Sequence, residues 1–590
     1  MLKNPLCLFA FALTLLPCAA APAQTGSDID IQRNVTMKTR DGVTLHADIY
    51  QPAAAGSYPV LLTRTPYDKN NSADFGRRGA LRGFIVVIQD VRGRYTSEGE
   101  WYPFKNEIND GYDTVEWAAA LPHSNGKVGM FSGSYVGATQ MLAAISHPPH
   151  LAGICPIVTA SNYHENWTYQ GGAFEQWFDE SWTSGLAQDT LNRAIRERTN
   201  ARIGDPVLPL DQYPVFNIDK GLTGTELTRV LAPYFLDWLA HPNYDDYWKQ
   251  WSIEENYANI QVPSLTVAAW YDLFQGGSLR NYVGLHDHAG NPAARSAQHL
   301  IVAIGGHSGS GRKVGDVDFG PDAAFDENAV TLDWYDYLFK GKQNEFATGK
   351  PVHIFVMGDN KWRDEDSWPL ERAKETRYFL HSAGKANTAS GDGALSTEPG
   401  HSQSPDTFVY DPGNPVPTVG GPLCCSIQIE PGARDQKDLE GRPDVLVYST
   451  PPLDQDTEVT GPVTLDLYAK SSAVNTDFTA KLVDVGPNGF AQNLTEGILR
   501  AVYRESTSAP TPIVPGQVYE YKIDVWSTSN VFLKGHRIRL EVSSSNFPRF
   551  DRNLNTGKTA AESSEFVKAT NTILHDPEHP SALILPIVPR

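Results

Sequence analysis

The chain has 590 residues, with 49 Lys and Arg against 69 Asp and Glu, which gives a formal charge of −20. Because a single core stops growing near roughly 250 to 300 residues, this length predicts two or three domains. Hydrophobic residues make up 41% of the chain and aromatic residues 11%, a composition that excludes a disordered polymer. Binding to a nucleic-acid backbone requires a basic stripe, and no segment supplies one, so we expect no nucleic-acid partner.

The first residues match an export signal. Lys3 gives a positive start, residues 6–16 are almost wholly apolar, and Ala21-Pro22-Ala23 offers small residues for cleavage. We therefore assign residues 1–23 to a signal peptide and expect an exported protein, periplasmic or secreted. The apolar run is too short to span a bilayer, and no later run approaches the roughly 20 apolar residues that a spanning helix needs, so we expect no membrane insertion.

The cysteines leave two questions open. Cys18 could be a lipid-anchored cysteine instead of part of a cleaved signal, although Pro17 before it fits such processing poorly. Of the three cysteines that remain after cleavage, Cys155 lies in an apolar run and is expected to be a buried strand residue. The adjacent Cys424 and Cys425 could form a vicinal disulfide or remain two packed thiols.

Residues 29–160 alternate between strand and helix patterns. The run Phe-Ile-Val-Val-Ile-Gln at residues 84–89 is apolar and β-branched throughout, as in a strand that is buried on both faces. Such alternation predicts an α/β fold with a parallel sheet flanked by helices. Strands are expected at residues 43–50, 58–63, 84–89, 128–131 and 151–158, and helices at 109–120 and 135–145.

Three later segments differ in character. Residues 161–257 are rich in Trp, Tyr and helix formers, which predicts a helical insertion, here called the cap. The strand pattern resumes at 263–269 and 300–304, so residues 258–350 should complete the sheet. Residues 351–590 contain short strands separated by turn residues, a pattern typical of a β-sandwich or jelly roll. Its strands are expected at 376–380, 445–449, 463–469, 478–483, 519–525 and 537–542.

The segment Gly129-Met-Phe-Ser-Gly-Ser-Tyr-Val-Gly137 follows a predicted strand directly and precedes a predicted helix. A serine on such a sharp turn exposes its hydroxyl, and the helix N-terminus points at a developing oxyanion. The G-x-S-x-G spacing makes Ser134 the candidate nucleophile, with Ser132 in place of the first glycine and Gly137 one position beyond the usual flank. We expect Ser132 to be tolerated if the backbone there keeps a negative φ.

An aspartate and a histidine follow in the order that an α/β-hydrolase requires. Asp272 follows the apolar run 265–270, and His307 follows the strand at 300–304. In the catalytic interpretation, His307 takes the proton of Ser134 and Asp272 fixes the imidazole tautomer. In the alternative, Asp272 caps a turn and His307 forms hydrogen bonds in a loop; the chain order and the strand-end placement favour the first.

Short segments from about residue 30 to beyond residue 540 match one family in order. They are Arg64-Thr-Pro-Tyr-Asp-Lys69, Gln89-Asp-Val-Arg-Gly93 with Ser97-Glu-Gly99, Val128-Gly-Met-Phe131 with Ser134-Tyr135, Trp270-Tyr-Asp272, and Asp435-Gln436 with Asp444-Val-Leu-Val-Tyr448. On these segments the chain resembles the serine hydrolases of the cocaine esterase, glutaryl-cephalosporin acylase and X-Pro dipeptidyl-peptidase group (CocE/NonD type). The resemblance implies an α/β-hydrolase domain with an inserted helical cap and a C-terminal jelly roll of galactose-binding-like type.

The resemblance also implies roles for particular residues. It makes Ser134, Asp272 and His307 a catalytic triad, and it places the hydroxyl of Tyr67 and the backbone N–H of Tyr135 in the oxyanion hole. In aryl-ester members, two cap tryptophans and a phenylalanine just after the catalytic Asp form the acyl pocket, and the matching residues here are Trp167, Trp182 and Phe274. A further alternative, which the resemblance does not supply, makes the C-terminal domain part of the active site, with residues near Leu423 closing the acyl pocket. Alternatively, these aromatic residues only pack the cap on the sheet.

The sequence therefore predicts a serine esterase or acylase that acts on a small-molecule ester or amide and needs no metal or other cofactor. Dipeptidyl-peptidase and α-amino acid ester hydrolase or β-lactam acylase activities remain alternatives. Relatives with those activities bind a substrate ammonium, through carboxylates where Phe274 and Gln275 stand here or through an extra N-terminal domain that this chain does not show.

A glycan-binding protein with an inactive hydrolase domain is the alternative from another class. It predicts that a triad residue is missing, and none is. The oligomeric state stays open, and a homo-oligomer is compatible with the sequence.

Overall fold

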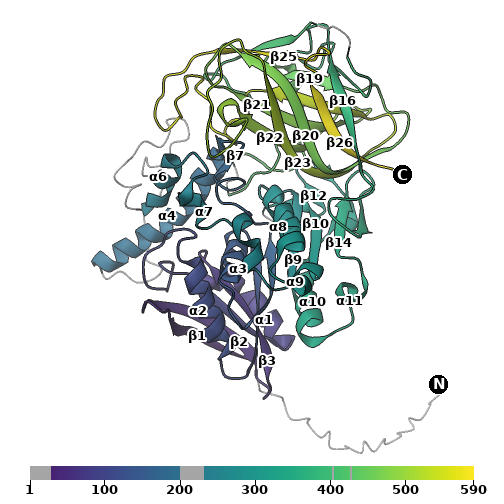
Figure 1. Cartoon of the computed structure of the whole chain (residues 1–590). Helices are drawn as coiled ribbons and strands as arrows, with labels where there is room; N and C mark the ends of the chain where they lie inside the picture. The colour runs from purple at the N-terminus through teal and green to yellow at the C-terminus, as the bar shows by residue number, and fades with distance from the viewer. Residues whose placement is uncertain (1–27, 200–230, 308, 401–403, 426–427) are drawn as a thin grey trace, which may run out of the picture.

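The computed structural model describes residues 28–199, 231–307, 309–400, 404–425 and 428–590. The predicted signal peptide, residues 1–23, and residues 200–230 of the predicted cap lie outside the described residues. Figure 1 shows an α/β body, a C-terminal β-domain stacked on it, and cap helices at the side of both.

A large mixed sheet forms the centre of the α/β body. In spatial order its strands are β1 (Ile29–Lys38), β2 (Thr44–Pro52), β4 (Ile85–Asp90), β3 (Tyr58–Thr65), β5 (Ser124–Gly133), β6 (Leu151–Ile157), β9 (Ser264–Tyr271), β10 (Gln298–Gly306), β14 (Val352–Val356) and β15 (Lys361–Glu365), with β11 (Gly309–Ser310) paired to β10. Neighbours from β4 to β14 run parallel. The outer strands β1, β2 and β15 are antiparallel. The predicted α/β class is confirmed.

Helices cover both faces of this sheet because its inner strands are apolar on both sides. Leu62 of β3 packs in one core with α2 and α3, and its neighbour Leu61 packs in the opposite core with α1 and α10. The strands predicted at 43–50, 58–63, 84–89, 128–131 and 151–158 are confirmed within a few residues at each end. The helices of this body are α1 (Ala73–Leu81), α2 (Glu107–Ala119), α3 (Tyr135–Ile145), α8 (Gln275–His288), α9 (Pro292–Ser296), α10 (Glu327–Lys340) and α11 (Glu345–Thr348).

The sheet does not end at residue 350 as predicted. Val352 of β14 pairs in parallel with Leu300 of β10, and β15 pairs antiparallel with β14. The second α/β segment is therefore two strands longer than the predicted range 258–350. The prediction was wrong because β14 and β15 are short strands joined by a tight turn, the same pattern that marks the β-domain.

The cap is helical in its described residues, as predicted, with one small hairpin. Its helices are α4 (Gln176–Thr199), α6 (Pro233–Ala240), α7 (Asp246–Lys249) and the 3-10 turn η3 (Glu254–Asn259). The hairpin consists of β7 (Tyr169–Gln170) and β8 (Ala173–Phe174). Gly171 and Gly172 connect them at φ 54° and 78°, a left-handed conformation that glycine adopts without strain.

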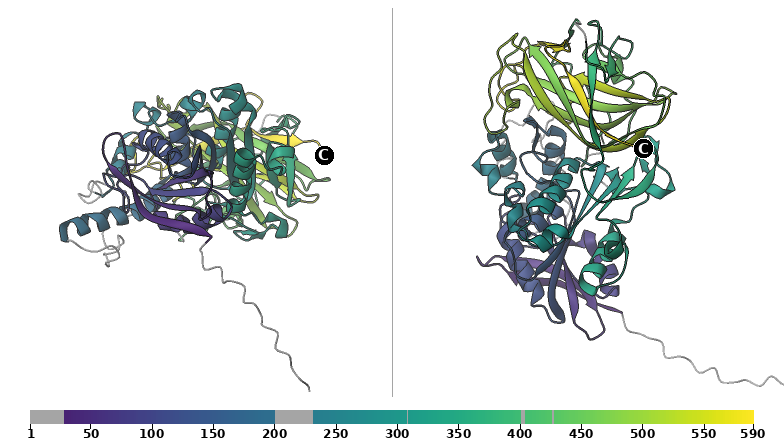
Figure 2. Two further views of the ribbon diagram at one scale, coloured as in Figure 1. Left: turned by 90° about the horizontal axis from the view of Figure 1, so that it is seen from below. Right: turned by 45° about the vertical axis from the view of Figure 1, so that its right-hand side comes forward.

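The C-terminal domain is all-β. Its strands are β18 (Asp406–Tyr410), β25 (Ala569–Leu574), β20 (Thr457–Ser471), β26 (Ala582–Val588), β16 (Lys374–His381), β17 (Ala394–Ser396), β19 (Leu446–Ser449), β24 (Arg537–Ser543), β21 (Asp477–Val485) and β22 (Ala491–Arg500) in spatial order, and β23 (Tyr519–Phe532) pairs with β20. All six strands predicted in this region are present. Figure 2 shows this domain at one end of the α/β body, from where it also reaches the cap.

His299, the second residue of β10, makes stability depend on pH. Its ring centroid lies 5.1 Å from that of Trp334 and 5.7 Å from that of Phe346. Burial lowers the pKa of His299 to about 4. Because the unfolded chain binds this proton below about pH 6.5 and the folded chain only near pH 4, the free energy of unfolding falls as the pH drops through this window, by at most roughly 2 kcal/mol between pH 7 and 5.

We expect His299→Phe to reduce the loss of melting temperature between pH 7 and pH 5, because phenylalanine fits the same aromatic surroundings and does not titrate. Scanning calorimetry at both pH values measures this loss. His286→Phe, at an exposed position of α8, is the matched control and should behave as the wild type. Equal losses for His299→Phe and the wild type would contradict the assignment.

Candidate active site

Ser134 lies on a sharp turn between β5 and α3. Its φ and ψ are 61° and −132°, and its N–H donates to the carbonyl of Ile157 over 2.9 Å. A Cβ on Gly137 would lie 2.7 Å from Cβ of Thr159, so the helix can approach the segment that follows β6 this closely only with glycine there. Crowding therefore explains the small residues around the candidate nucleophile.

Ser132 does not keep the negative φ that we expected. Its φ is 101°, a conformation that costs a non-glycine residue of order 1 to 3 kcal/mol. The side-chain amide of Gln140 donates to the Ser132 carbonyl over 2.8 Å and so helps to fix this backbone. The turn keeps its geometry although serine replaces the usual glycine.

The structure brings the three candidate triad residues together from the ends of β5, β9 and β10, strands of the same sheet. The distance from Nε2 of His307 to Oγ of Ser134 is 2.8 Å, and that from Nδ1 of His307 to Oδ2 of Asp272 is 2.6 Å. The Asp272 side chain is fully buried, and its Oδ1 accepts from the backbone N–H of Phe274 over 2.7 Å. The carboxylate is held from both sides, so it can orient the imidazole.

Tyr67 lies beside the candidate nucleophile. Its hydroxyl oxygen accepts a hydrogen bond of 2.9 Å from Nε1 of Trp182. Since an indole can only donate, the proton of Tyr67 remains available for another acceptor. Burial raises the pKa of Tyr67, and the nearby polar groups of Trp182, Ser134 and the Tyr135 backbone offset part of that rise. The phenol is therefore neutral at pH 7 and near both Ser134 and the Tyr135 N–H.

The side chain of Tyr135 is anchored away from the site. Its hydroxyl donates to Oε1 of Glu107 over 3.1 Å and accepts from the N–H of Phe104 over 2.8 Å. Glu107 is held in turn by Nη1 of Arg64 at 2.6 Å. This buried chain of hydrogen bonds fixes the first residue of α3 and with it the direction of the backbone N–H next to Ser134.

Three aromatic side chains, Trp167, Trp182 and Phe274, form one wall beside the triad. The Trp167 and Phe274 rings stack at 4.6 Å with an angle of 12° between their planes, and Trp182 packs edge-on against Trp167 at 5.4 Å. Phe274 also contacts the His307 ring at 5.2 Å. All three are buried and share one apolar cluster. An apolar acyl group could stack on this wall.

Leu423 is buried, but the next residue, Cys424, is the one that belongs to the apolar cluster of the aromatic wall. Cys424 packs in the same apolar cluster as the three aromatic residues, and Leu423 does not. Cys424 is bonded to Cys425 with an S–S distance of 2.08 Å, so the structure contains the vicinal disulfide that the sequence left open.

Cys155 is a buried free thiol, as predicted, and burial raises its pKa to about 12, so it is no nucleophile at pH 7.

The β-domain holds the strand end that carries Asp272, a contact that the sequence did not reveal. The hydroxyl of Tyr271 donates to the carbonyl of Asn493 over 2.8 Å. The amide of Gln275 donates to the Ser527 carbonyl over 2.6 Å and accepts from the Ser527 N–H over 3.2 Å. Gln275, where ammonium-binding relatives were expected to carry a carboxylate, thus forms an interdomain hydrogen-bond pair.

Within the described ranges, no group of three or more His, Cys, Asp or Glu side chains is arranged to hold a metal ion. No helix among the described residues is both long and apolar enough to cross a membrane.

Comparison with known proteins gives the class. Residues 41–309 match the X-Pro dipeptidyl-peptidase (S15) family, and residues 344–584 match the X-Pro dipeptidyl-peptidase C-terminal non-catalytic domain. Cocaine esterase from Rhodococcus sp. (strain MB1 Bresler) is 40% identical over 583 residues, covering 95% of this chain and 99% of that enzyme. The fold and these matches define a hydrolase acting on ester or amide bonds. The chain belongs to the S15 family and is a cocaine esterase homologue, which confirms the resemblance found in the sequence.

Solved structures agree over nearly the whole chain. An aminopeptidase from a Thaumarchaeota archaeon superposes with a TM-score of 0.81 at 26% identity, covering 97% of this chain and 99% of that one. An α-amino acid ester hydrolase superposes with a TM-score of 0.79 at 26% identity, covering 97% and 98%. A CocE/NonD family hydrolase from Staphylococcus aureus, with a TM-score of 0.69 at 19% identity and coverage of 95% and 94%, shares the fold.

Proposed function

We propose that this protein is an exported serine esterase that hydrolyses carboxylic esters with an apolar or aromatic acyl group through an acyl-enzyme on Ser134. The observation that carries the proposal is the line of short hydrogen bonds from Ser134 through His307 to Asp272, next to the aromatic wall. Cocaine esterase, the 40% identical relative, is named for an ester substrate. The export signal and a jelly-roll topology of the β-domain are further parts of the proposal.

The geometry supports the following sequence of steps. His307 takes the proton of Ser134 as Oγ attacks the acyl carbon, and Asp272 stabilises the imidazolium that forms. His307 then returns the proton to the leaving oxygen as the C–O bond breaks. Water, deprotonated by His307, attacks the acyl-enzyme, and the proton goes back to Ser134 as the acid leaves. The oxyanion of both tetrahedral intermediates lies between the Tyr67 hydroxyl and the Tyr135 N–H.

Esters are favoured over amides on chemical grounds. An alkoxide or phenoxide leaves with less assistance than an amine, which needs well-placed protonation by His307 before it leaves. Phe274 and Gln275 are uncharged, and Gln275 is occupied by Ser527, so neither can offset the desolvation of a substrate ammonium. This argues against dipeptidyl-peptidase and α-amino acid ester hydrolase activity.

A substrate panel tests the proposal. Initial rates are measured on p-nitrophenyl acetate, butyrate, benzoate and glutarate, on phenylglycine methyl ester and on Ala-Pro-p-nitroanilide. Preference for the benzoyl or a short acyl ester is the expected result. Faster turnover of the phenylglycine ester or the anilide would mean that an ammonium site exists, and the proposed specificity would be wrong.

We expect Phe274→Ala to lower the benzoate-to-acetate ratio of kcat/KM by about tenfold or more, because it removes the ring that stacks on Trp167 and a buried aromatic contact is worth roughly 1.5 kcal/mol or more. Alanine keeps the backbone N–H that donates to Asp272, so turnover of the acetate should largely persist. Phe346→Ala, on the opposite side of the sheet, controls for general destabilisation. An unchanged ratio in Phe274→Ala would place the acyl group elsewhere.

A further inference from the structure

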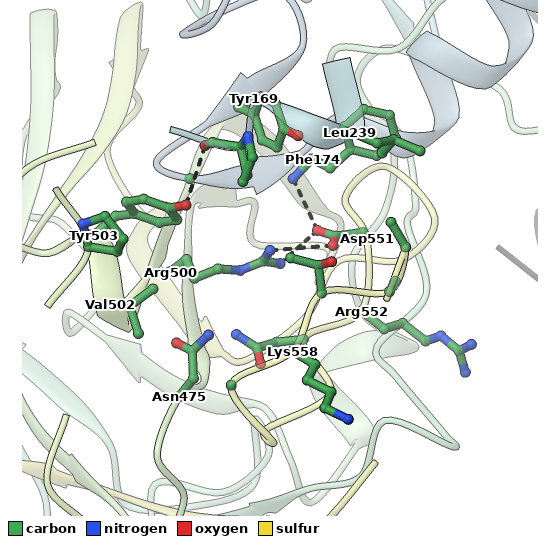
Figure 3. A pocket seen from close by; sticks show the side chains of 18 of the residues that line it. Tyr169, Phe174, Leu239, Asn475, Arg500, Val502, Tyr503, Asp551, Arg552 and Lys558 are labelled. Atoms are coloured by element: carbon green, nitrogen blue, oxygen red, sulfur yellow. Dashed lines mark hydrogen bonds and ion pairs between the residues drawn. The ribbon is translucent and has the colours of Figure 1, made fainter. Parts of the chain in front are cut away.

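A second cavity lies between the cap and the β-domain. Its volume is about 370 Å³, within the range of small-molecule sites. The wall from the cap includes Tyr169, Phe174 and Leu239, and the wall from the β-domain includes Asn475 and Val502. No triad residue and none of the three aromatic residues beside the triad lines it. Figure 3 shows the side chains of the two walls around the cavity.

The walls of this cavity are tied together by interdomain hydrogen bonds. The N–H of Phe174 donates to Oδ1 of Asp551 over 3.0 Å, and the N–H of Asp551 donates to the Phe174 carbonyl over 2.9 Å. The N–H of Arg500 donates to the carbonyl of Gly171 over 2.9 Å. The hydroxyl of Tyr503 donates to Oδ1 of Asn243 over 2.8 Å. These contacts hold the cavity open before any ligand arrives, which reduces the ordering cost of binding.

The charges of the lining favour an anion. Nη2 of Arg500 lies 2.6 Å from Oδ1 of Asp551 and 3.0 Å from Oδ2 of Asp477, so this guanidinium is fully compensated. Arg552 and Lys558 also line the cavity, and neither forms an ion pair with any part of the chain that the structure describes. The Arg552 guanidinium points away from the cavity (Figure 3), where it donates to the Pro412 carbonyl and lies over the Phe547 ring. Lys558, an exposed residue, therefore brings a cation without an ion-pair partner to this cavity, in a chain of net charge −20.

Apolar side chains on the cap side of the cavity face polar side chains on the β-domain side. Phe174 and Leu239 come from the cap side, and Asn475 and Lys558 come from the opposite side (Figure 3). Asn475 is only 7% exposed, and its Oδ1 accepts from the N–H of Thr476. Its Nδ2 has no hydrogen-bond partner among the described residues. Because Asn475 lines the cavity and this donor has no partner in the part of the chain that the structure describes, it can donate to a ligand or a water there.

Val474 extends the apolar lining to the rim. It is 43% exposed although it is one of the large hydrophobic residues, and it lines the cavity beside Asn475. Such a side chain at the mouth of an apolar cavity is covered when a ligand with an apolar body binds.

We propose that this cavity binds an amphipathic monocarboxylate, with its aromatic or medium-length aliphatic body against Phe174 and Leu239 and its carboxylate near Asn475 and Lys558. The site is separate from the triad, and it does not depend on the esterase function. Burial of apolar area on the cap side supplies the affinity. Nδ2 of Asn475 and Nζ of Lys558 make the site select an anion over a neutral or cationic ligand.

Isothermal titration calorimetry with 4-phenylbutyrate tests the site, with 4-phenyl-1-butanol and 4-phenylbutylammonium as neutral and cationic analogues. The titrations use the full chain before and after treatment with phenylmethylsulfonyl fluoride, which would occupy the acyl pocket through Ser134. We expect one equivalent of the acid to bind in both forms. If Ser134 does not react, the proposed function fails, and titration of the untreated chain still reports on the cavity.

Variants locate the binding. Val502→Trp, which fills the cavity, should weaken binding by more than about tenfold, and Ala561→Phe, on an outer loop that lines the cavity, serves the same purpose if Val502→Trp does not fold. Lys558→Glu should weaken binding by about fivefold. Lys534→Glu, an exposed lysine elsewhere on the β-domain, is the matched control and should change it by less than about twofold.

Three results would overturn the proposal. The first is the absence of 4-phenylbutyrate binding up to millimolar concentrations. The second is binding of the alcohol or the ammonium as tight as that of the acid. The third is wild-type affinity in a folded cavity-filling variant.

Discussion

Ser134→Ala should lower kcat/KM for a p-nitrophenyl ester by about 10⁶-fold, the order of loss seen when a catalytic serine is removed from a triad. The physical reason is that in the proposed mechanism Oγ forms the covalent bond to the acyl group, and no other hydroxyl among the described residues lies within hydrogen-bonding distance of His307 Nε2. The same substitution should abolish labelling by a fluorophosphonate. Steady-state rates and mass spectrometry of the labelled protein measure the two effects.

Ser132→Gly is the matched control because it changes a serine on the same turn. Ser132 holds a φ of 101°, which glycine adopts freely, so this variant should fold, react with the fluorophosphonate and keep activity within about a few-fold of the wild type. Full labelling of Ser134→Ala, or complete inactivity of Ser132→Gly, would mean that the nucleophile has been assigned to the wrong residue.

The sequence pattern identified the sharp turn that carries Ser134 but not the backbone strain at this turn. A strand, a small-residue turn and a helix are visible in the order of residues 128–145, and the structure has β5, the turn and α3 there. The φ of Ser132 could not be inferred, because serine replaces glycine at a position where glycine alone would have indicated a positive φ. The amide of Gln140 that fixes this backbone comes from the helix that follows.

The predictability of strands depended on their burial. The strand β4 is buried at all six positions and was found as one apolar run. The edge strand β1 is exposed at most positions, and its sequence Ile-Asp-Ile-Gln-Arg-Asn-Val-Thr-Met-Lys has no long apolar run, so it was missed. It forms because β2 offers a hydrogen-bonding edge, a tertiary cause that local sequence does not contain.

Contacts between segments that are distant in the chain limited how much of the candidate site could be predicted from the sequence. The positions of Asp272 and His307 followed from strand ends, because parallel strands bring their carboxyl ends to one edge. Tyr67 was identified only through the family resemblance, since nothing local distinguishes it from a packed tyrosine. The contact of Gln275 with Ser527 joins residues 252 positions apart, and the place of Cys424 beside the cap depends on how the domains meet.

Tyr67→Phe should lower kcat by about 10²- to 10³-fold and change KM little, because a donor to the oxyanion acts in the transition state and not in the bound ester. Trp182 would lose the acceptor for its Nε1, but the phenyl ring keeps the packing.

Tyr58→Phe, which removes a surface hydroxyl that donates to the Ala54 carbonyl, is the control and should leave both constants unchanged. Fluorophosphonate labelling of Tyr67→Phe should be slower than in the wild type but complete, since Ser134 and His307 remain in place. A wild-type kcat in Tyr67→Phe would show that the phenol is not an oxyanion donor and would leave that role to the Tyr135 N–H and another group. A rise in KM at constant kcat would instead make Tyr67 a substrate-binding residue, because an interaction equal in ground and transition states alters binding alone.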